Sequence, residues 1–291
     1  MTHGLQPRRK PIGGVAMLAL LLTGTLLGGT VTIPDSALIP TSQLYTSDYG
    51  NIVVMTGGGN APGVGDPSGR NDDGFSGPIN LGFTLDYFGT DYTQFYVNNN
   101  GNISFGGGIS AYTPSGLTGA NAPVISPFFS DVDTRNSASG VVMLNTSIAN
   151  EIIVTWPGVG YYNNQADLLD TFQLILRGPG YSVPPGEGQI GFFWTTMQWE
   201  VGGASGGSGG FCQGTTYQDG TCFPAAVGFG DGLGNSQVLQ NSTVPGVSAL
   251  VNDESIWFNL TNGVPTTTPE PGTWALLASG LAGVLFWRRR K

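Results

Sequence analysis

Short runs in which apolar residues recur at every second position, separated by turns of Gly, Asn, Asp and Pro, dominate the chain. In residues 171–177, Phe172, Leu174 and Leu176 fall on one face of an extended strand. Helical periodicity is nearly absent before the C-terminal tail. The pattern predicts strands at residues 52–56, 83–88, 94–97, 102–105, 141–145, 151–156, 171–177, 189–196, 226–229 and 255–260.

Many short strands joined by glycine-rich turns are typical of two packed antiparallel sheets, so we predict an all-β, sandwich-like domain. The 48 glycines among 291 residues fit this fold, because many turns need a positive φ. Residues 57–78 and 202–210 are expected to be loops, the second one flexible and at the surface. We divide the chain into a signal peptide (1–34), a lead-in (35–82), a β domain (83–262) and a tail (263–291).

Both ends of the chain are predicted to be helical and apolar. Basic residues 8–10 precede an apolar stretch and then small residues, which is the order of a secretory signal peptide; a retained anchor is the alternative. At the other end, a polar linker precedes apolar residues 274–287 and the basic residues 288–291. The apolar run of about 15 residues is roughly 22 Å long as a helix, which is short for a permanent span of about 30 Å.

This three-part tail resembles the PEP-CTERM sorting signal of Gram-negative bacteria, through Pro269, Glu270 and Pro271, the apolar stretch and the terminal arginines. The resemblance implies export to the cell surface or matrix, processing by an exosortase, and transient anchoring in the inner membrane through residues 274–287. An ordinary C-terminal anchor is the alternative.

Charge is unevenly distributed along the chain. Residues 35–270 hold all 19 acidic residues and only Arg70, Arg135 and Arg177, a formal charge of −16. So acidic a domain repels phosphate backbones, which excludes nucleic acid as a partner. A Walker phosphate-binding loop is excluded because it needs a lysine and the chain has none between Lys10 and Lys291. A histidine-dependent hydrolase or a histidine zinc site is excluded because His3, the one histidine, lies in the predicted signal peptide. We therefore expect no enzymatic activity and no obligatory cofactor.

The two cysteines fit an exported protein. Cys212 and Cys222 flank the turn signal Asp219-Gly220, so we predict a disulfide that closes a hairpin loop. Closing so short a loop would contribute roughly 2.5–3 kcal/mol in the chain-entropy model.

Six blocks in the body, in this order, resemble the nidogen-like (NIDO) extracellular domain: residues 87–98, 100–105, 125–134, 154–162, 171–176 and 197–200. The resemblance covers roughly residues 83–230 and extends to 261. It implies an extracellular adhesive or matrix-associated module and supplies no catalytic residue set.

Asp131 and Asp133 stand two residues apart and would share one face of a strand. Carboxylates with loop carbonyls suit Ca²⁺, so a calcium site is one interpretation; a structural turn or a pair with Arg135 is the other. The Asn71-Asp-Asp-Gly74 loop is also rich in oxygen, and we expect it to be solvated.

Aromatic and acidic residues suggest two other functions. Trp156, Trp194 and Trp257 lie in strand runs and are expected in the core, whereas Tyr161 and Tyr162 are expected in a loop, where they could stack on sugars. A glycosidase would need two carboxyls about 5–9 Å apart. The acids that could supply such a pair are Glu151, Asp170, Glu187 and Glu200.

Together, these features predict an exported surface or matrix protein with a structural or adhesive role. The alternatives are a module that binds carbohydrate or exopolysaccharide and, from another class, a secreted glycan hydrolase. The expected partners are an exosortase and extracellular polysaccharide or surface proteins.

Overall fold

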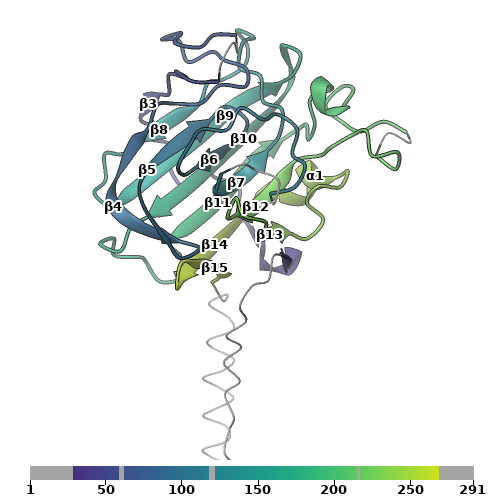
Figure 1. Ribbon diagram of the computed structural model, residues 1–291. Helices are drawn as coiled ribbons and strands as arrows, with labels where there is room; N and C mark the ends of the chain where they lie inside the picture. Colours follow the sequence, from purple (N-terminus) through teal and green to yellow (C-terminus); the bar gives the residue numbers. More distant parts are fainter. Residues whose placement is uncertain (1–28, 59–61, 118–121, 215–216, 269–291) are drawn as a thin grey trace, which may run out of the picture.

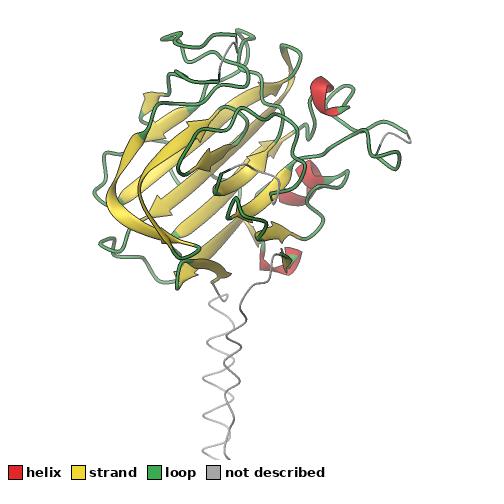
Figure 2. Ribbon diagram, in the orientation of Figure 1, coloured by secondary structure: helices red, strands yellow, loops and turns green. Residues whose placement is uncertain are grey.

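The computed structural model describes residues 29–58, 62–117, 122–214 and 217–268. Within these ranges the protein is all-β, with two large sheets and almost no helix (Figures 1 and 2). The predicted terminal helices lie outside the described residues. No helix inside these ranges is long and apolar enough to cross a membrane.

The first sheet has seven strands in the order β1-β13-β12-β7-β6-β5-β4. All its neighbours are antiparallel except β1 and β13, which run parallel from Thr30↔Ser236 to Ile33↔Leu239. Its strands are β1 (Thr30–Ile33), β4 (Ile79–Tyr87), β5 (Thr90–Asn98), β6 (Asn102–Ser104), β7 (Val124–Phe129), β12 (Ala226–Gly230) and β13 (Ser236–Leu239).

The second sheet has the order β15-β14-β11-β10-β9-β8-β3, and β2 also pairs with β14. Its strands are β2 (Ile39–Pro40), β3 (Asn51–Ile52), β8 (Met143–Asn145), β9 (Glu151–Tyr161), β10 (Gln165–Arg177), β11 (Ile190–Met197), β14 (Glu254–Thr261) and β15 (Val264–Thr267). Three single turns of helix complete the described elements: η1 (Asp35–Ala37), η2 (Gly203–Ser205) and α1 (Val247–Val251).

Aromatic side chains pack the two sheets together. Phe172 of β10 lies 5.6 Å from Phe128 of β7, and Phe192 of β11 stacks on Phe229 of β12 at 5.4 Å between ring centroids. These contacts lie within one large core cluster that draws on both sheets. The all-β prediction is confirmed, and each of the ten expected runs overlaps a strand.

Strand β10 is covered on both of its faces, although its alternation predicts only one buried face. Phe172, Leu174 and Leu176 face the main core, as predicted. On the opposite face, Ile175 joins a separate cluster covered by Leu44 and Tyr45 from the lead-in segment. The sheet is therefore covered on its outer face by residues that precede the expected domain boundary at 83.

Strand β7 was not predicted, although it lies at the centre of the first sheet. All six of its residues are buried, and four of them divide between two core clusters, with Ile125 and Phe128 in one and Val124 and Phe129 in the other. A strand buried on both faces shows no alternation, and its Pro127 argues against a central strand by composition.

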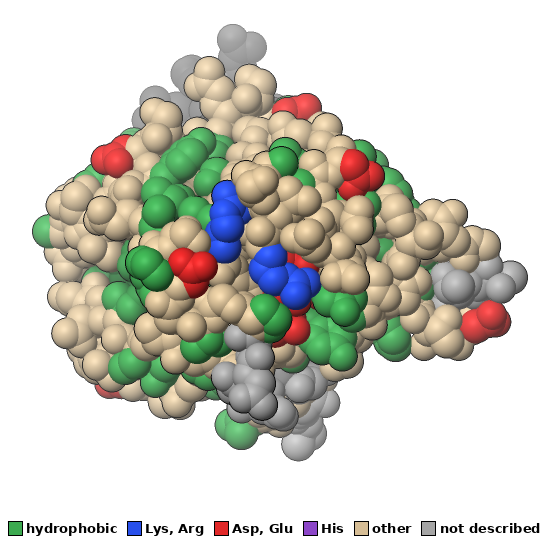
Figure 3. All heavy atoms as spheres, turned by 90° about the horizontal axis from the view of Figure 1, so that it is seen from above, with side chains coloured by type: hydrophobic (Ala, Val, Ile, Leu, Met, Phe, Trp, Pro, Cys, Tyr) green, Lys and Arg blue, Asp and Glu red, His purple; other side chains and the backbone are tan. Residues whose placement is uncertain are grey.

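The two ends of the described chain lie at one pole of the domain and the loop 57–78 at the other. In Figure 1, β15 is at the bottom of the view, and the purple-blue loop that leads into β4 is at the top. The space-filling view of this upper face shows arginine side chains beside acidic ones near its centre (Figure 3).

Candidate functional site

Three acidic side chains from distant parts of the sequence meet at the loop 57–78. Asp72 and Asp73 come from this loop, and Asp131 follows β7. One carboxylate oxygen from each of the three lies within 4.8 Å of the others. Asp72 and Asp131 are buried and Asp73 is half-buried. We call these three residues the acidic cluster.

The turn between β5 and β6 joins the two acidic segments. The backbone N–H of Asn99 donates to the carbonyl of Gly74 (2.9 Å), next to Asp73, and the Asn99 amide nitrogen donates to the carbonyl of Val132, next to Asp131. Asn100 donates from Nδ2 to Oδ1 of Asp73 (2.9 Å). Both asparagines therefore lie against the acidic cluster.

Gly101 allows this turn to approach β7. Its φ is +77°, and a Cβ atom at this position would lie 1.9 Å from the carbonyl oxygen of Phe128. Only glycine meets both conditions, because a positive φ strains other residues and the contact leaves no space for a side chain. The sequence thus fixes the turn that carries Asn99 and Asn100 beside the residues after β7.

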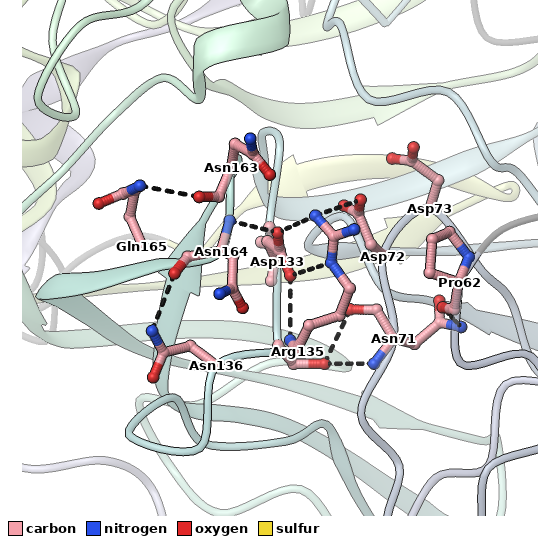
Figure 4. A network of polar contacts seen from close by, with 12 residues as sticks. Pro62, Asn71, Asp72, Asp73, Asp133, Arg135, Asn136, Asn163, Asn164 and Gln165 are labelled. Atoms are coloured by element: carbon pink, nitrogen blue, oxygen red, sulfur yellow. Dashed lines mark hydrogen bonds and ion pairs between the residues drawn. The ribbon is translucent and has the colours of Figure 1, made fainter.

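Asp133 belongs to a different network, drawn in Figure 4. Arg135 donates from Nε to Oδ1 of Asp133 (2.8 Å), pairs with Oδ2 of the same carboxylate, and also pairs with Oδ2 of Asp72 at 2.9 Å. The backbone N–H of Asn164 donates to Oδ2 of Asp133 (2.6 Å). In the same view no contact is drawn between Asp73 and Arg135.

The structure therefore separates the two residues that the sequence placed together. Both carboxylate oxygens of Asp133 are bound, by the Arg135 side chain and by the backbone N–H of Asn164. For Asp133, this agrees with the alternative in which the carboxylate pairs with Arg135. Asp131 instead lies with Asp72 and Asp73. The Asn71–Gly74 loop, expected to be solvated, is largely buried, with Asn71 at 0% exposure.

Several oxygens around the acidic cluster lack a hydrogen-bond donor. Both carboxylate oxygens of Asp131 are buried without a donor among the described residues, as is Oδ1 of Asp72. The side-chain oxygens of Asn99 and Asn100 are in the same state. A buried polar atom without a partner usually costs about 1–3 kcal/mol, so a group of five calls for an explanation.

Burial and mutual repulsion disfavour the charged forms of these carboxyls. Burial, followed by the charges of Asp73 and Asp72, raises the pKa of Asp131 to about 8. The backbone N–H of Ala204 opposes this rise in pKa, but neither Asp131 oxygen has a hydrogen bond of acceptable geometry. Burial, and then Asp133 and Asp73, raise the pKa of Asp72 to about 7 against the opposing effect of Arg135.

The glycine-rich segment 202–210 lies at the surface, as predicted, but three of its residues are buried against the protein: Gly202, Ser205 and Gly210. A Cβ atom at Gly202 would lie 2.5 Å from Oδ2 of Asp131. Ser205 is 1% exposed and donates to the carbonyl of Tyr112 (3.2 Å). The absence of a side chain at Gly202 leaves the space that Asp131 occupies.

The predicted disulfide is confirmed, because Cys212 and Cys222 are bonded with Cα atoms 5.8 Å apart. Burial of Trp156, Trp194 and Trp257 is also confirmed, at 0%, 0% and 6% exposure.

The two tyrosines differ from each other. Tyr161 is the last residue of β9, is only 3% exposed and packs on Trp199 at 5.5 Å, so its placement in a surface loop was wrong. Tyr162 is half-buried, with the Arg135 guanidinium 5.7 Å from its ring centre. Contact with a ligand through Tyr162 stays a prediction.

The four candidate glycosidase carboxyls are all engaged within the fold. Glu151 and Glu187 bind the same guanidinium, that of Arg177, at 2.7 and 2.6 Å. Asp170 accepts the backbone N–H groups of Gln198 and Trp199. Glu200 accepts the backbone N–H of Gly246 at 2.8 Å.

Sequence comparison finds a family profile that covers most of the chain and relatives that align with up to about half of it. A family profile described as NIDO related matches residues 45–264, and the PEP-CTERM protein-sorting motif matches residues 267–291. Alpha-tectorin is 31% identical in Mus musculus and 30% in Homo sapiens, in each case over 164 residues that cover 47% of this chain. Nidogen of Drosophila melanogaster is 30% identical over 119 residues, 32% of this chain.

The aligned regions make up 7% of each alpha-tectorin and 9% of the nidogen, so the chain spans less than a tenth of these relatives. No solved structure matches the chain. The sorting motif and the relatives together indicate an exported extracellular protein. Because the NIDO profile covers well over half of its residues, the chain belongs to the NIDO-related family.

Proposed function

We propose that this chain is a structural or adhesive protein of the bacterial cell surface or extracellular matrix, and that an exosortase processes its tail. The observation that carries the proposal is the direct succession of a NIDO-related domain (45–264) and a sorting motif (267–291). The last strand, β15, ends at Thr267, where the motif begins. The sorting device and the displayed domain are therefore contiguous.

The arrangement of the domain supports display. The strand that leads to the sorting motif lies at the pole opposite the loop 57–78 (Figure 1). A domain held through its C-terminal end would present that loop, and the acidic cluster beside it, away from the point of attachment. Such polar loops positioned by a rigid sheet are where binding functions concentrate in β domains.

The acidic domain also fits a structural role better than catalysis. The candidate carboxyls Glu151 and Glu187 are bound by Arg177, and the carboxylates of Asp170 and Glu200 accept backbone N–H groups. Each of these contacts holds parts of the fold together. A glycosidase needs two carboxyls that face each other across a cleft. These four carboxyls are instead held by contacts within the fold.

The proposal is tested in a bacterium that has an exosortase and displays the full chain. Cell-surface and matrix fractions are compared between the native chain and a variant in which Pro269, Glu270 and Pro271 are all changed to alanine. Thr266→Ala, next to the motif, is the matched control. We expect the native chain and the control in the surface or matrix fraction and the motif variant in the membrane fraction; equal distribution of all three would contradict sorting by this motif.

The adhesive role is tested separately, by attachment and biofilm assays on a deletion strain complemented with the native chain. We expect attachment or matrix cohesion to fall on deletion and to return on complementation. Unchanged attachment and cohesion in the deletion strain would contradict the structural or adhesive role while leaving the sorting result intact.

Carbohydrate binding is a second candidate, favoured by the partly exposed Tyr162 ring beside Arg135. Binding of the exported protein to immobilised host exopolysaccharide is compared for Tyr162→Ala and for Tyr112→Ala, a more exposed tyrosine as control. A loss confined to Tyr162→Ala supports the candidate. Equal binding by both variants contradicts it. Tyr161 is unsuitable for this test because its burial makes any loss ambiguous.

A further inference from the structure

We propose that Asp72, Asp73 and Asp131 form a binding site for one Ca²⁺ ion at the pole opposite the sorting motif. The side-chain oxygen of Asn100 lies at the edge of this site, and the buried side-chain oxygen of Asn99 lies in the adjoining β5–β6 turn. This inference is independent of the adhesive role, because it rests only on the geometry of the described residues.

The spacing of the carboxylates matches a shared cation. Ca²⁺ binds oxygens at about 2.3–2.6 Å, so two oxygens on opposite sides of the ion are about 4.8 Å apart. One oxygen from each of the three carboxylates lies within 4.8 Å of the others. The three carboxylates are therefore close enough together to share a single ion.

The unpartnered oxygens supply the second, independent observation. Asn99 and Asn100 are 0% and 1% exposed, and each uses its amide nitrogen as a donor, which fixes its oxygen as the free atom. Because Asn100 donates to Asp73, its free oxygen lies at the edge of the acidic cluster. Asp131, at 0% exposure, adds two oxygens without donors. A hard cation is the ligand that a group made only of acceptors would take.

The local charge also requires compensation. Four carboxylates lie together here, those of Asp72, Asp73, Asp131 and Asp133. Among the described residues, Arg135 is the one arginine that forms an ion pair with any of them. Arg70 is close by, but its guanidinium donates to backbone carbonyls, including Thr134 (2.7 Å) and Ser139 (3.0 Å). Adjacent buried carboxylates repel each other, and a divalent cation removes this repulsion.

A bound ion would tie three segments together. Asp72 and Asp73 hold the loop 57–78, Asp131 holds the residues after β7, and the asparagines hold the β5–β6 turn. The only direct ion pair between the first two segments is that of Arg135 with Asp72, within the described residues. Calcium would therefore fix the loop at the exposed pole.

The experiment uses the exported protein after treatment with a chelator. Calorimetric titration with CaCl₂ measures stoichiometry, and thermal unfolding is followed with CaCl₂, with MgCl₂ and with chelator. We expect one Ca²⁺ per chain with a Kd below about 10⁻³ M, as in extracellular modules. At a free Ca²⁺ concentration ten times the Kd, the midpoint of thermal unfolding should rise by about 3–6 °C.

Two variants locate the ion. Asp131→Asn should abolish the Ca²⁺-induced shift while leaving the chelated protein as stable as the native one or more so, because it removes repulsion. Asp73→Asn, at the half-buried edge, serves if Asp131→Asn does not fold. Asp91→Asn, an exposed acid on β5, is the control and should keep the full shift.

Three results would overturn the proposal. The first is the absence of both binding heat and a shift in the native protein. The second is a shift that persists in both Asp131→Asn and Asp73→Asn, which would place the ion elsewhere. The third is Mg²⁺ binding as tightly as Ca²⁺, which would contradict the assignment of the ion.

Discussion

Arg177 and Glu151 are register partners across the β9–β10 ladder, and their side chains form an ion pair of 2.7 Å with both side chains 0% exposed. The guanidinium also lies over the Trp257 ring, 4.5 Å from its centre. Glu187 binds the other side of the same guanidinium. This cage joins β9, β10 and β14 on the outer face of the second sheet.

The first prediction concerns this pair. Arg177→Met should lower the free energy of unfolding by about 3–5 kcal/mol, because it leaves the Glu151 carboxylate buried without its partner. The double variant Arg177→Met/Glu151→Gln should recover a large part of that loss. Urea denaturation of the two single variants and the double variant measures the coupling. Strictly additive losses would contradict the pairing.

The second prediction concerns Gly202. Its φ is −84°, so alanine suits the backbone, but the new Cβ would lie 2.5 Å from Oδ2 of Asp131. Gly202→Ala should therefore lower stability by about 1–3 kcal/mol through overpacking. Gly107→Ala is the control, since nothing lies within 4 Å of its Cβ position. Thermal melts in chelator compare the two, and equal midpoints would show that Asp131 does not occupy this space.

The third prediction concerns the pH dependence of stability. Asp170 is buried, and burial raises its pKa well above the usual value despite two backbone N–H donors. The folded state then holds a proton that the unfolded state has released, so stability falls as pH rises above about 4, the pKa of an unfolded Asp. Asp170→Asn removes this titration. The native protein should therefore lose stability relative to Asp170→Asn as pH increases.

Urea melts between pH 4.5 and 8 measure that difference, with Asp91→Asn as an exposed control. Acidic groups distant from both Asp170 and Asp91 are common to all three proteins and cancel in the comparison. A difference between native and Asp170→Asn that stays constant with pH would contradict a raised pKa at Asp170.

The fourth prediction concerns the mature N-terminus. The backbone carbonyl of Gly29 accepts the N–H of Ser236 (3.2 Å), and the hydroxyls of Thr30 and Ser236 are hydrogen-bonded at 3.0 Å. Strand β1 adds four residues to the edge of the first sheet through these contacts. We therefore expect signal cleavage to leave Gly29 in the mature chain, so that the signal peptide ends before residue 29 and not at residue 34, because residues 30–33 form strand β1. N-terminal sequencing of the exported protein checks this, and a chain that begins after Ile33 would contradict it.

Runs rich in β-branched and aromatic residues and bounded by turn residues were predictable as strands, whether or not they alternate. β10 and β11 are such runs, and both were identified. β7 was missed because it shows no alternation and contains Pro127, and β1, β2 and β15 were missed because strands of two to four residues carry little signal. These short strands are defined by their partners, β13 and β14, rather than by their own residues.

The candidate site was predictable only in part, for a related reason. Asp131 was identified as a candidate from its spacing with Asp133, yet that spacing also fits the ion pair with Arg135 that the structure shows. Asp72 and Asp73 lie nearly 60 residues away from Asp131 along the chain. The signals that could have pointed to them are the paired aspartates and the run Asn98–Asn100, but only the tertiary fold brings these together.

The central claim is that the chain is exported and its tail processed, and the intact mass of the exported protein tests it most directly. We predict a product that lacks residues 274–291 in a host with an exosortase and retains them when the exosortase gene is deleted. An exported protein that still carries residues 274–291 in the exosortase-containing host would contradict the account.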